Sequence, residues 1–200
     1  MQLDRTNRTT FQTAFEGKQW DVSFDQTCYS PIEVRDSIEA LKNHCSHYVF
    51  TSTMAVYEYG TNIKEESFQP ESYEFTFKKR EEYKGIRGYQ EAKRASEAYL
   101  FQQSEIPVTA VRFAIVLGED DYTERLLFHV KSIKQDQPIY IKDLSFSTSF
   151  ISSNDAANFL YFVADQRKTG QFNAAFTENL SFKELAQKIE KVTNRKARLT

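Results

Sequence analysis

The sequence predicts an α/β fold in which a parallel, doubly wound sheet is covered by helices on both faces. Segments with the apolar spacing of helices alternate along the chain with short β-branched and aromatic runs. That alternation is typical of a parallel sheet whose strands are joined by helices. Residues 107–117 (PVTAVRFAIVL) are nearly all apolar, as expected of a strand buried on both faces.

The first 45 residues predict a helix, a strand and a second helix. Residues 8–16 place apolar side chains at helical spacing, and Gly17 follows as a C-terminal cap. Residues 20–25 (WDVSFD) form a short strand. Pro31 stands in the first turn of the next helix, where its missing N–H costs nothing. The apolar positions of that helix are Ile32, Val34, Ile38 and Leu41.

The middle of the chain predicts two further strands and the helix between them. Residues 47–52 (HYVFTS) are a β-branched and aromatic run that ends in hydroxyl side chains. Residues 61–83 are polar, charged and aromatic without a period, so we expect a long loop there. A helix over about residues 89–103 then leads to the strand at 107–117.

The C-terminal part continues the same alternation. We expect helices over residues 123–135, 154–163 and 181–193, and short strands over 139–141 and 171–174. Ser153 or Asn154 would cap the second of these helices, and Ser181 with Glu184 would form a capping box for the third.

The composition argues against several classes of protein. A net charge of −2, with acidic and basic residues mixed, gives no electrostatic footprint for nucleic acid. No run of 18 apolar residues could span a membrane, and the polar start MQLDRTNRTT is not a signal peptide. Cys28 and Cys45 provide neither a disulfide framework nor a metal-binding spacing, so we expect buried small side chains and no metal site. These features favour a cytoplasmic protein.

Tyr89 and Lys93 carry the chemistry that the sequence suggests. They lie four residues apart in GYQEAKRASEAYL, so a helix places them on one face. An ammonium beside a phenol lowers the pKa of the phenol, and a nearby hydroxyl can orient the reacting oxygen. Such a group normally serves hydride transfer to or from a nicotinamide ring. The alternative is that Tyr89 is an aromatic residue at a helix start and Lys93 its solvated neighbour.

Four segments, in this order, resemble the NAD-dependent epimerase/dehydratase group of the extended short-chain dehydrogenase/reductase superfamily. They are FTSTMAVYEYG, YQEAK, VRFAIVLGEDD and SFISSNDAANFL. The first departs from the family pattern because Glu58 and Tyr59 come before Gly60. The resemblance implies a Rossmann-like dinucleotide-binding domain over residues 1–118 and a smaller, mixed, substrate-side part over 119–200. Its nearest branch is that of the isoflavone reductase-like and chloroplast stem-loop-binding proteins.

The resemblance implies three catalytic residues. Tyr89 matches the tyrosine that acts as general acid and base. Lys93 matches the lysine that lowers the pKa of the tyrosine and binds the nicotinamide ribose. Thr53, three residues before Val56, matches the hydroxyl that orients the substrate oxygen.

The resemblance also implies cofactor contacts. Asp4, in LDRTN, resembles the aspartate that contacts the adenine amino group. Thr27 and Cys28, in the loop after WDVSFD, match the turn that passes over the cofactor, together with Lys93. Asp155 matches a family aspartate that we interpret as a helix cap, and Arg112 is expected in an ion pair.

The sequence lacks the glycine-rich loop that the family uses for the pyrophosphate. Its six glycines form no G-x-x-G-x-x-G pattern. We therefore expect an N-terminally truncated fold that lacks the first βαβ unit, about 30 residues or more. NAD or NADP would be the cofactor of a complete member, and weak or absent binding is expected from this chain because a pyrophosphate needs a helix N-terminus and close backbone approach. Loss of that unit would leave a strand of the sheet without its neighbour, and a homodimer, another partner chain or a rearrangement would cover this edge.

Two classes of function stay open. The first is an NAD(P)-dependent epimerase, dehydratase or reductase for a nucleotide-sugar or another small hydroxy or keto substrate, inactive as this fragment. The second is a non-catalytic binding protein or degenerate remnant, with RNA as a candidate ligand. The basic cluster at residues 78–84 (KKREEYK) would favour RNA, but the acidic balance of the chain argues against it.

Overall fold

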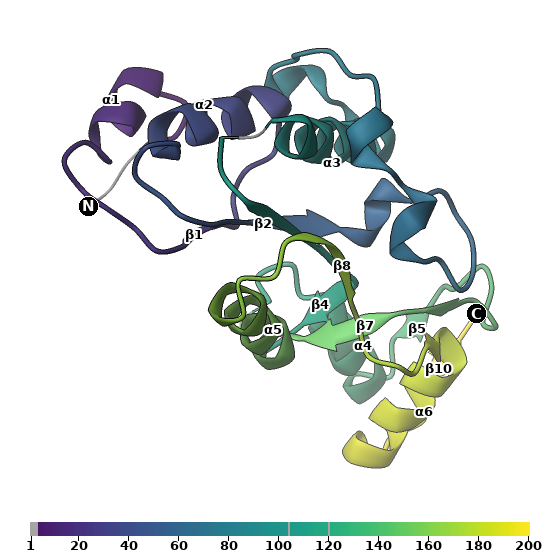
Figure 1. The fold of residues 1–200 in the computed structure, drawn as a ribbon. Coiled ribbons are helices and arrows are strands. Elements are labelled where there is room, and N and C mark those ends of the chain that lie inside the picture. The colour runs from purple at the N-terminus through teal and green to yellow at the C-terminus, as the bar shows by residue number, and fades with distance from the viewer. Residues whose placement is uncertain (1–3, 104, 120) are drawn as a thin grey trace. The chain divides into compact units, whose positions relative to one another are not determined.

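The computed structural model describes residues 4–103, 105–119 and 121–200 (Figure 1). These residues divide into two compact units. The first comprises the described residues up to Phe113 together with Phe159–Asn173, and the second comprises Ala114–Asn158 and Ala174–Thr200. Each unit is described by itself.

A four-stranded sheet is the centre of the first unit. Its strands lie in the order β1, β2, β3, β8, and the β1–β2 and β2–β3 pairs are parallel. In register, Ser23 lies beside Tyr48, and Tyr48 lies beside Val108. The predicted α/β class with a parallel sheet is confirmed. The strands are β1 (Ser23–Asp25), β2 (Tyr48–Thr53), β3 (Val108–Phe113) and β8 (Gly170–Ala174).

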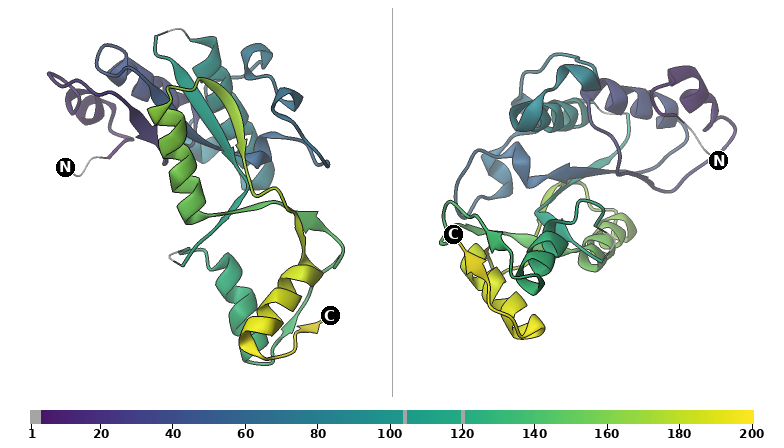
Figure 2. Two further views of the ribbon diagram at one scale, coloured as in Figure 1. Left: turned by 60° about the horizontal axis from the view of Figure 1, so that its bottom comes forward. Right: turned by 180° about the vertical axis from the view of Figure 1, so that it is seen from behind.

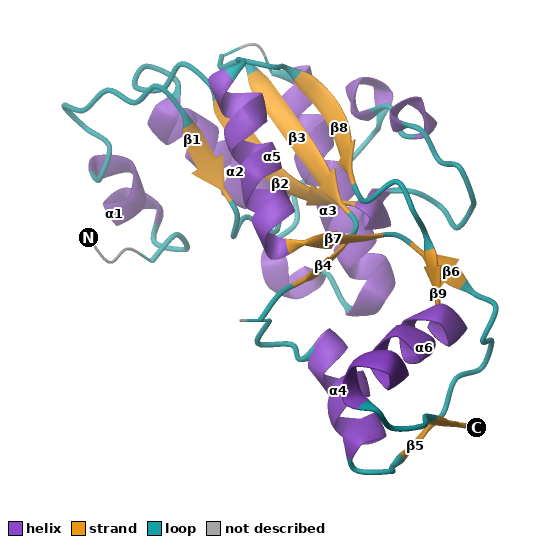
Figure 3. Cartoon of the chain, turned by 90° about the horizontal axis from the view of Figure 1, so that it is seen from below, coloured by secondary structure: helices purple, strands orange, loops and turns teal. Residues whose placement is uncertain are grey.

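Helices cover both faces of this sheet. Helices α2 (Pro31–Leu41) and α3 (Gly85–Gln102) lie on one face, and the last turns of α5 (Ser153–Asp165) lie on the other (Figures 1 and 3). The predicted start of α2 is confirmed, because Pro31 is its first residue and the Ser30 hydroxyl accepts from the Glu33 N–H. Between the sheet and α2 and α3 lies an apolar core that includes Val34, Ile38, Leu41, Tyr48, Phe50, Leu100 and Ala110.

Several predicted boundaries were wrong. Helix α1 (Arg8–Thr13) ends before Gly17, although Gly17 does adopt a positive φ of 68°. Helix α3 begins at Gly85, four residues before Tyr89, because the Gly88 N–H donates to the Lys84 carbonyl and closes the first turn there. The expected loop at 61–83 contains three short 3-10 turns, at Glu65–Ser67, Pro70–Ser72 and Arg80–Glu82, and a further turn, Met54–Val56, directly follows β2.

The apolar run 107–117 is not one strand. Strand β3 ends at Phe113, and β4 (Ile115–Leu117) pairs with β7 (Phe150–Ser152) in the second unit. At the break, the Ala114 N–H donates to the Ala174 carbonyl at 3.0 Å. The apolar composition does not mark this change of sheet, because it continues from the buried β3 into the half-buried β4.

The second unit has a small core between α4 (Arg125–Lys134) and α6 (Phe182–Thr193). The capping box of α6 is confirmed, since Ser181 and Glu184 each accept from the backbone of the other. Helix α5 is capped by Ser152 rather than by Ser153 or Asn154, because the Ser152 hydroxyl accepts from the Asp155 N–H. Short pairs β5 (Pro138–Ile139) with β10 (Arg198–Leu199) and β6 (Ser147–Thr148) with β9 (Leu180–Ser181) complete it (Figure 2). Within the described ranges, no helix has both the length and the apolar character needed to cross a membrane.

Candidate functional site

Lys93 is the buried centre of the candidate site. Its side chain leaves α3 toward the sheet, where the ammonium donates to the Cys28 carbonyl at 2.8 Å and the Thr51 carbonyl at 2.9 Å. The ammonium also lies 4.6 Å from the centre of the Phe50 ring. Only 5% of Lys93 is exposed, so it is not the solvated helix neighbour of the alternative interpretation.

Burial sets the electrostatics of this lysine. It lowers the pKa of Lys93, because an ammonium loses hydration in the interior, although nearby acidic groups such as Asp25 oppose the change. An ammonium has three donors, and the two carbonyls use two of them. No other described residue accepts from this ammonium, so the third donor is available to a hydroxyl or another acceptor of a ligand.

Tyr89 lies one turn before Lys93 and is half-buried. Its ring centre is 5.7 Å from that of Tyr29, at an interplanar angle of 45°. Tyr29 directly follows Cys28, so one helix places both Tyr89 and Lys93 against the loop between β1 and α2. The structure therefore brings together the predicted helix pair and the predicted loop.

Thr53 stands at the C-terminal end of β2, beside Phe113 of β3. Its hydroxyl oxygen accepts from the Ala55 N–H at 3.2 Å and caps the 3-10 turn that follows. The hydroxyl hydrogen is not used by that bond. Thr53 is thus held at the strand end with a donor to offer, and its role toward a substrate stays a prediction.

Asp25 anchors the loop after β1. Its carboxylate accepts two hydrogen bonds from Arg5, at 2.7 and 2.8 Å, one from the Cys28 N–H at 3.1 Å and one from the Tyr48 hydroxyl. Arg5 also donates to the Thr27 hydroxyl at 2.8 Å. Burial raises the pKa of Asp25, but the hydrogen bonds and charge of Arg5 outweigh burial and hold it below its ordinary value. These bonds fix the loop that touches Lys93.

The other predicted cofactor residues differ in what they do here. Cys28 contributes its backbone carbonyl, whereas burial raises the pKa of its thiol well above the ordinary value and keeps it protonated. Asp4 is exposed, and its carboxylate accepts from the backbone and hydroxyl of Thr6. Those bonds lower its pKa and close a local turn, so a contact between Asp4 and adenine stays a prediction.

Two residues that the sequence reasoning missed tie α3 to the segment after β2. Gln90 donates to the Tyr57 carbonyl at 2.7 Å, and Arg94 donates to the Val56 carbonyl at 2.5 Å. The signal was available, because Gln90 and Arg94 are four apart and each follows one of the Tyr89–Lys93 pair. They hold the turn after Thr53 next to the helix that carries Tyr89.

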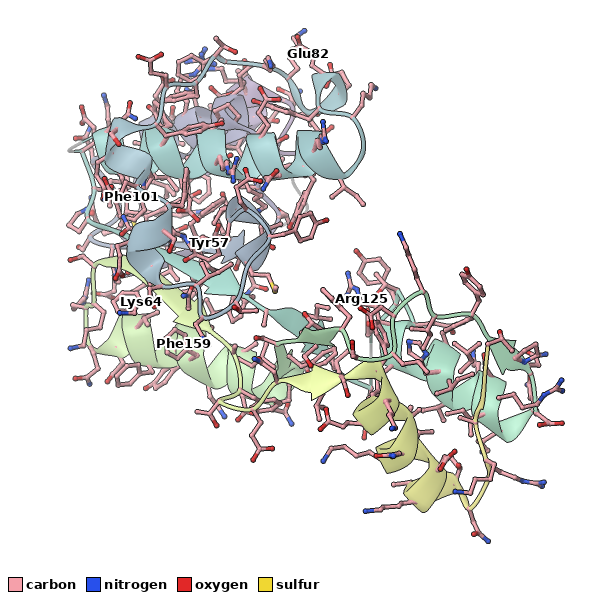
Figure 4. All side chains as sticks on the ribbon, turned by 90° about the vertical axis from the view of Figure 1, so that its right-hand side faces the viewer. Tyr57, Lys64, Glu82, Phe101, Arg125 and Phe159 are labelled. Atoms are coloured by element: carbon pink, nitrogen blue, oxygen red, sulfur yellow. The ribbon has the colours of Figure 1, made fainter. Side chains whose placement is uncertain are left out.

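Arg112 makes the ion pair that was predicted for it, with Glu97 as the partner that the sequence did not name. The side chains of both are completely buried, and the closest N–O distance is 2.6 Å. Arg112 also donates to the Tyr57 hydroxyl at 2.8 Å and to the carbonyls of Glu65 and Phe68. Figure 4 labels Tyr57 on this segment. The pair fastens the long segment after β2 to the sheet and is structural.

No group of three or more candidate metal ligands occurs among the residues that the structure describes. The charged side chains near Lys93 are used in ion pairs, and the site contacts described above come from carbonyls, hydroxyls, a phenol ring and one ammonium. This donor set suits the binding of hydroxyl groups and the transfer of a proton.

Solved structures with the same fold include two UDP-sugar 4-epimerases. Pal from Bacillus thuringiensis matches with a TM-score of 0.74 at 19% identity, covering 100% of this chain and 67% of that chain. The UDP-glucuronic acid 4-epimerase of Bacillus cereus, in complex with UDP-4-deoxy-4-fluoro-glucuronic acid and NAD, gives 0.74 at 15% identity with the same coverage. The UDP-glucose 4-epimerase of Thermus thermophilus, in complex with NAD, gives 0.69 at 14% identity, covering 99% of this chain and 70% of that chain. At such identities the likeness shows the fold alone, and the chain spans about two-thirds of these proteins.

The family itself is shown by sequence. A search of curated proteins found no match. Nothing among the similar structures above supports the narrower isoflavone reductase-like branch. The model of the NAD dependent epimerase/dehydratase family matches residues 32–175, which include Thr53, Tyr89 and Lys93. The chain therefore belongs to the NAD-dependent epimerase/dehydratase family.

Proposed function

We propose that this chain provides the proton-transfer site of an NAD-dependent epimerase, dehydratase or reductase that acts on a nucleotide-sugar. The observation that carries the proposal is Lys93, buried between the Cys28 and Thr51 carbonyls one helical turn after Tyr89. Burying an ammonium costs free energy unless its donors are satisfied. A purely structural residue at this place would not need the charge or the third donor.

The described residues fit one end of a nicotinamide dinucleotide. The spare donor of Lys93 suits a ribose hydroxyl. No matching contact for the pyrophosphate follows from the sequence, which has no G-x-x-G-x-x-G pattern. Lys93, held by the Cys28 and Thr51 carbonyls, would bind the nicotinamide ribose, and the cofactor, when bound, would accept or return a hydride.

The residues of the chain would manage the proton. Tyr89, as the phenolate, would take the proton from a substrate hydroxyl as the carbon is oxidised, and the phenol so formed would return it on reduction. The Lys93 ammonium, one helical turn away, would favour that phenolate by its positive charge. The hydroxyl of Thr53, with its oxygen held by the Ala55 N–H, would donate to the same substrate oxygen and orient it.

The substrate class is proposed from the similar structures. The Bacillus cereus epimerase is in complex with a UDP-sugar acid analogue, and a Thermotoga maritima UDP-glucose 4-epimerase is in complex with UDP-glucose. The Thermotoga maritima structure matches with a TM-score of 0.71 at 16% identity, and the match covers 70% of that chain. A UDP-hexose or UDP-hexuronic acid is therefore the first substrate to test. The choice between NAD and NADP is left to the same assay.

The test is turnover of UDP-glucose and UDP-glucuronic acid by the chain with millimolar NAD, followed by chromatography of the epimers. Tyr89→Phe should lower kcat by roughly 10²–10⁴-fold, the usual contribution of one general acid or base. Tyr99→Phe, on the same helix, is the matched control and should turn over normally. Equal turnover by wild type and Tyr89→Phe would assign the proton to another group. No turnover of either sugar at NAD or NADP concentrations shown to saturate the chain would favour the non-catalytic alternative.

A further inference from the structure

A row of three tyrosine rings ends at Tyr89. The ring centre of Tyr29 lies 5.7 Å from Tyr89 and 6.4 Å from Tyr83. Tyr83 is buried, with 7% exposed, whereas Tyr29 and Tyr89 are half-buried. Tyr29 thus separates the proposed proton-transfer residue from a fixed ring of the segment before α3.

Tyr29 is held from two sides by charged groups. Its backbone N–H donates to Glu33 at 3.0 Å. Arg80 binds both oxygens of the same carboxylate at 2.7 Å and the Thr27 carbonyl at 3.0 Å, and its guanidinium carbon lies 5.1 Å from the centre of the Tyr29 ring. A bidentate guanidinium–carboxylate pair fixes geometry as well as charge. We call Glu33, Arg80 and the Thr27 carbonyl the Tyr29 clamp.

The segment that carries Arg80 is pressed against the start of α3. A Cβ at Gly88 would lie 2.7 Å from the Tyr83 carbonyl carbon, closer than any side chain permits. Lys78, in the same segment, forms an ion pair with Glu91 at 2.6 Å. Glu82, at its outer side, is exposed (Figure 4). The backbone of this segment and that of the helix therefore define where Arg80 can reach.

We propose that Tyr29, fixed by its clamp, is a positioning residue that selects the side-chain rotamer of Tyr89. The inference rests on the proposed function of Tyr89. A helix leaves a tyrosine two common χ1 wells, at about 180° and −60°. Only one of them can place the phenol at a given substrate oxygen. In this proposal the Tyr29 ring, with its centre 5.7 Å from that of Tyr89, occupies the space that the other rotamer would need.

The direct test is the χ1 distribution of Tyr89, measured from three-bond couplings by NMR on the full chain. The wild type and Tyr29→Phe, which keeps the ring, should show one χ1 well. Tyr29→Ala should show averaging over two, and Arg80→Gln should show partial averaging because the clamp is lost. Tyr99→Ala and Arg8→Gln are controls with an aromatic contact or ion pair away from Tyr89, and they should leave it in one well. A single unchanged well in both Tyr29→Ala and Arg80→Gln would overturn the proposal.

Kinetics separate this proposal from the proposed function. With UDP-sugar and millimolar NAD, Tyr29→Ala should lower kcat about 10–100-fold with KM changed less than about twofold, since a misplacement of about 1 Å can cost 10²-fold. Tyr29→Phe should restore kcat. Normal kcat in Tyr29→Ala, when Tyr89→Phe is impaired, would refute the positioning role alone. Normal kcat in Tyr89→Phe would refute the proposed function, and the couplings would still decide whether Tyr29 selects the rotamer.

Discussion

Neutralising Glu97 should destabilise the first unit more than neutralising an exposed carboxylate does. Glu97→Gln keeps the volume of the side chain and removes the charge that balances Arg112. The Arg112 guanidinium donates to both Glu97 oxygens, with N–O distances of 2.6, 3.1 and 3.1 Å, and both side chains are fully buried. The Ser52 hydroxyl donates to the same carboxylate. The substitution leaves a buried cation facing an amide.

The expected loss is about 3–5 kcal/mol, the usual cost of removing one partner from a buried ion pair. Glu39 is the matched control, because it pairs with Arg8 and Arg35 but is partly exposed. Glu39→Gln should cost less than about 1 kcal/mol. Most of the larger cost belongs to the stranded charge, so Glu97→Leu combined with Arg112→Met should be more stable than Glu97→Gln alone.

The assay is urea unfolding followed by circular dichroism at neutral pH. The midpoint of Glu97→Gln should fall well below those of wild type and Glu39→Gln. Hydrogen exchange should also rise at the Tyr57 and Phe68 amides, because Arg112 fastens that segment. A loss below about 1 kcal/mol for Glu97→Gln would show that water or another group compensates the charge, and the structural role assigned to the pair would be wrong.

Three further outcomes follow from particular contacts. Burial raises the pKa of Asp25 but Arg5 lowers it more, so the pKa lies below its ordinary value. The ionised carboxylate therefore stabilises the fold fully above about pH 4, and this contribution is lost as the pH falls through the lowered pKa. Asp25→Asn should accordingly make the free energy of unfolding depend less on pH over that acid range. Gly88→Ala should cost about 1–3 kcal/mol, because its Cβ meets backbone at 2.7 Å, although alanine alone favours a helix by about 1 kcal/mol; a more stable variant in urea would contradict this. Ser152→Ala should cost about 1 kcal/mol by removing the cap of α5, whereas Asn154→Ala should cost less, and equal thermal midpoints would reject the assignment.

The sequence predicted those parts of the fold that have local causes. Pro31 predicted the start of α2, and Ser181 with Glu184 predicted the start of α6, because both signals act within the first turn of a helix. The break at Ala114 was missed because it depends on Ala174, sixty residues away, and on which sheet each half of the run joins. Both halves are rich in apolar residues, so composition gives no sign of the break.

The candidate site was predictable only in part. Tyr89 and Lys93 were predicted from their spacing and from the family pattern, and the structure adds that Lys93 is held by two backbone carbonyls. Backbone partners leave no trace in the identity of a residue. Tyr29 and Arg80 were missed because they are 51 positions apart and meet only when the segment before α3 folds over the β1–α2 loop.

Saturation-transfer NMR with NAD tests most directly whether Lys93 and the β1–α2 loop form the nicotinamide-ribose end of a cofactor site. The method detects weak binding, and it reports which ligand protons touch the protein. We expect the strongest saturation transfer to protons of the nicotinamide ribose and the weakest to those of the adenine. The ribose signals should be lost in Lys93→Met and should be unchanged in Lys134→Met. Transfer dominated by the adenine, or ribose signals unchanged in a folded Lys93→Met variant, would contradict the account.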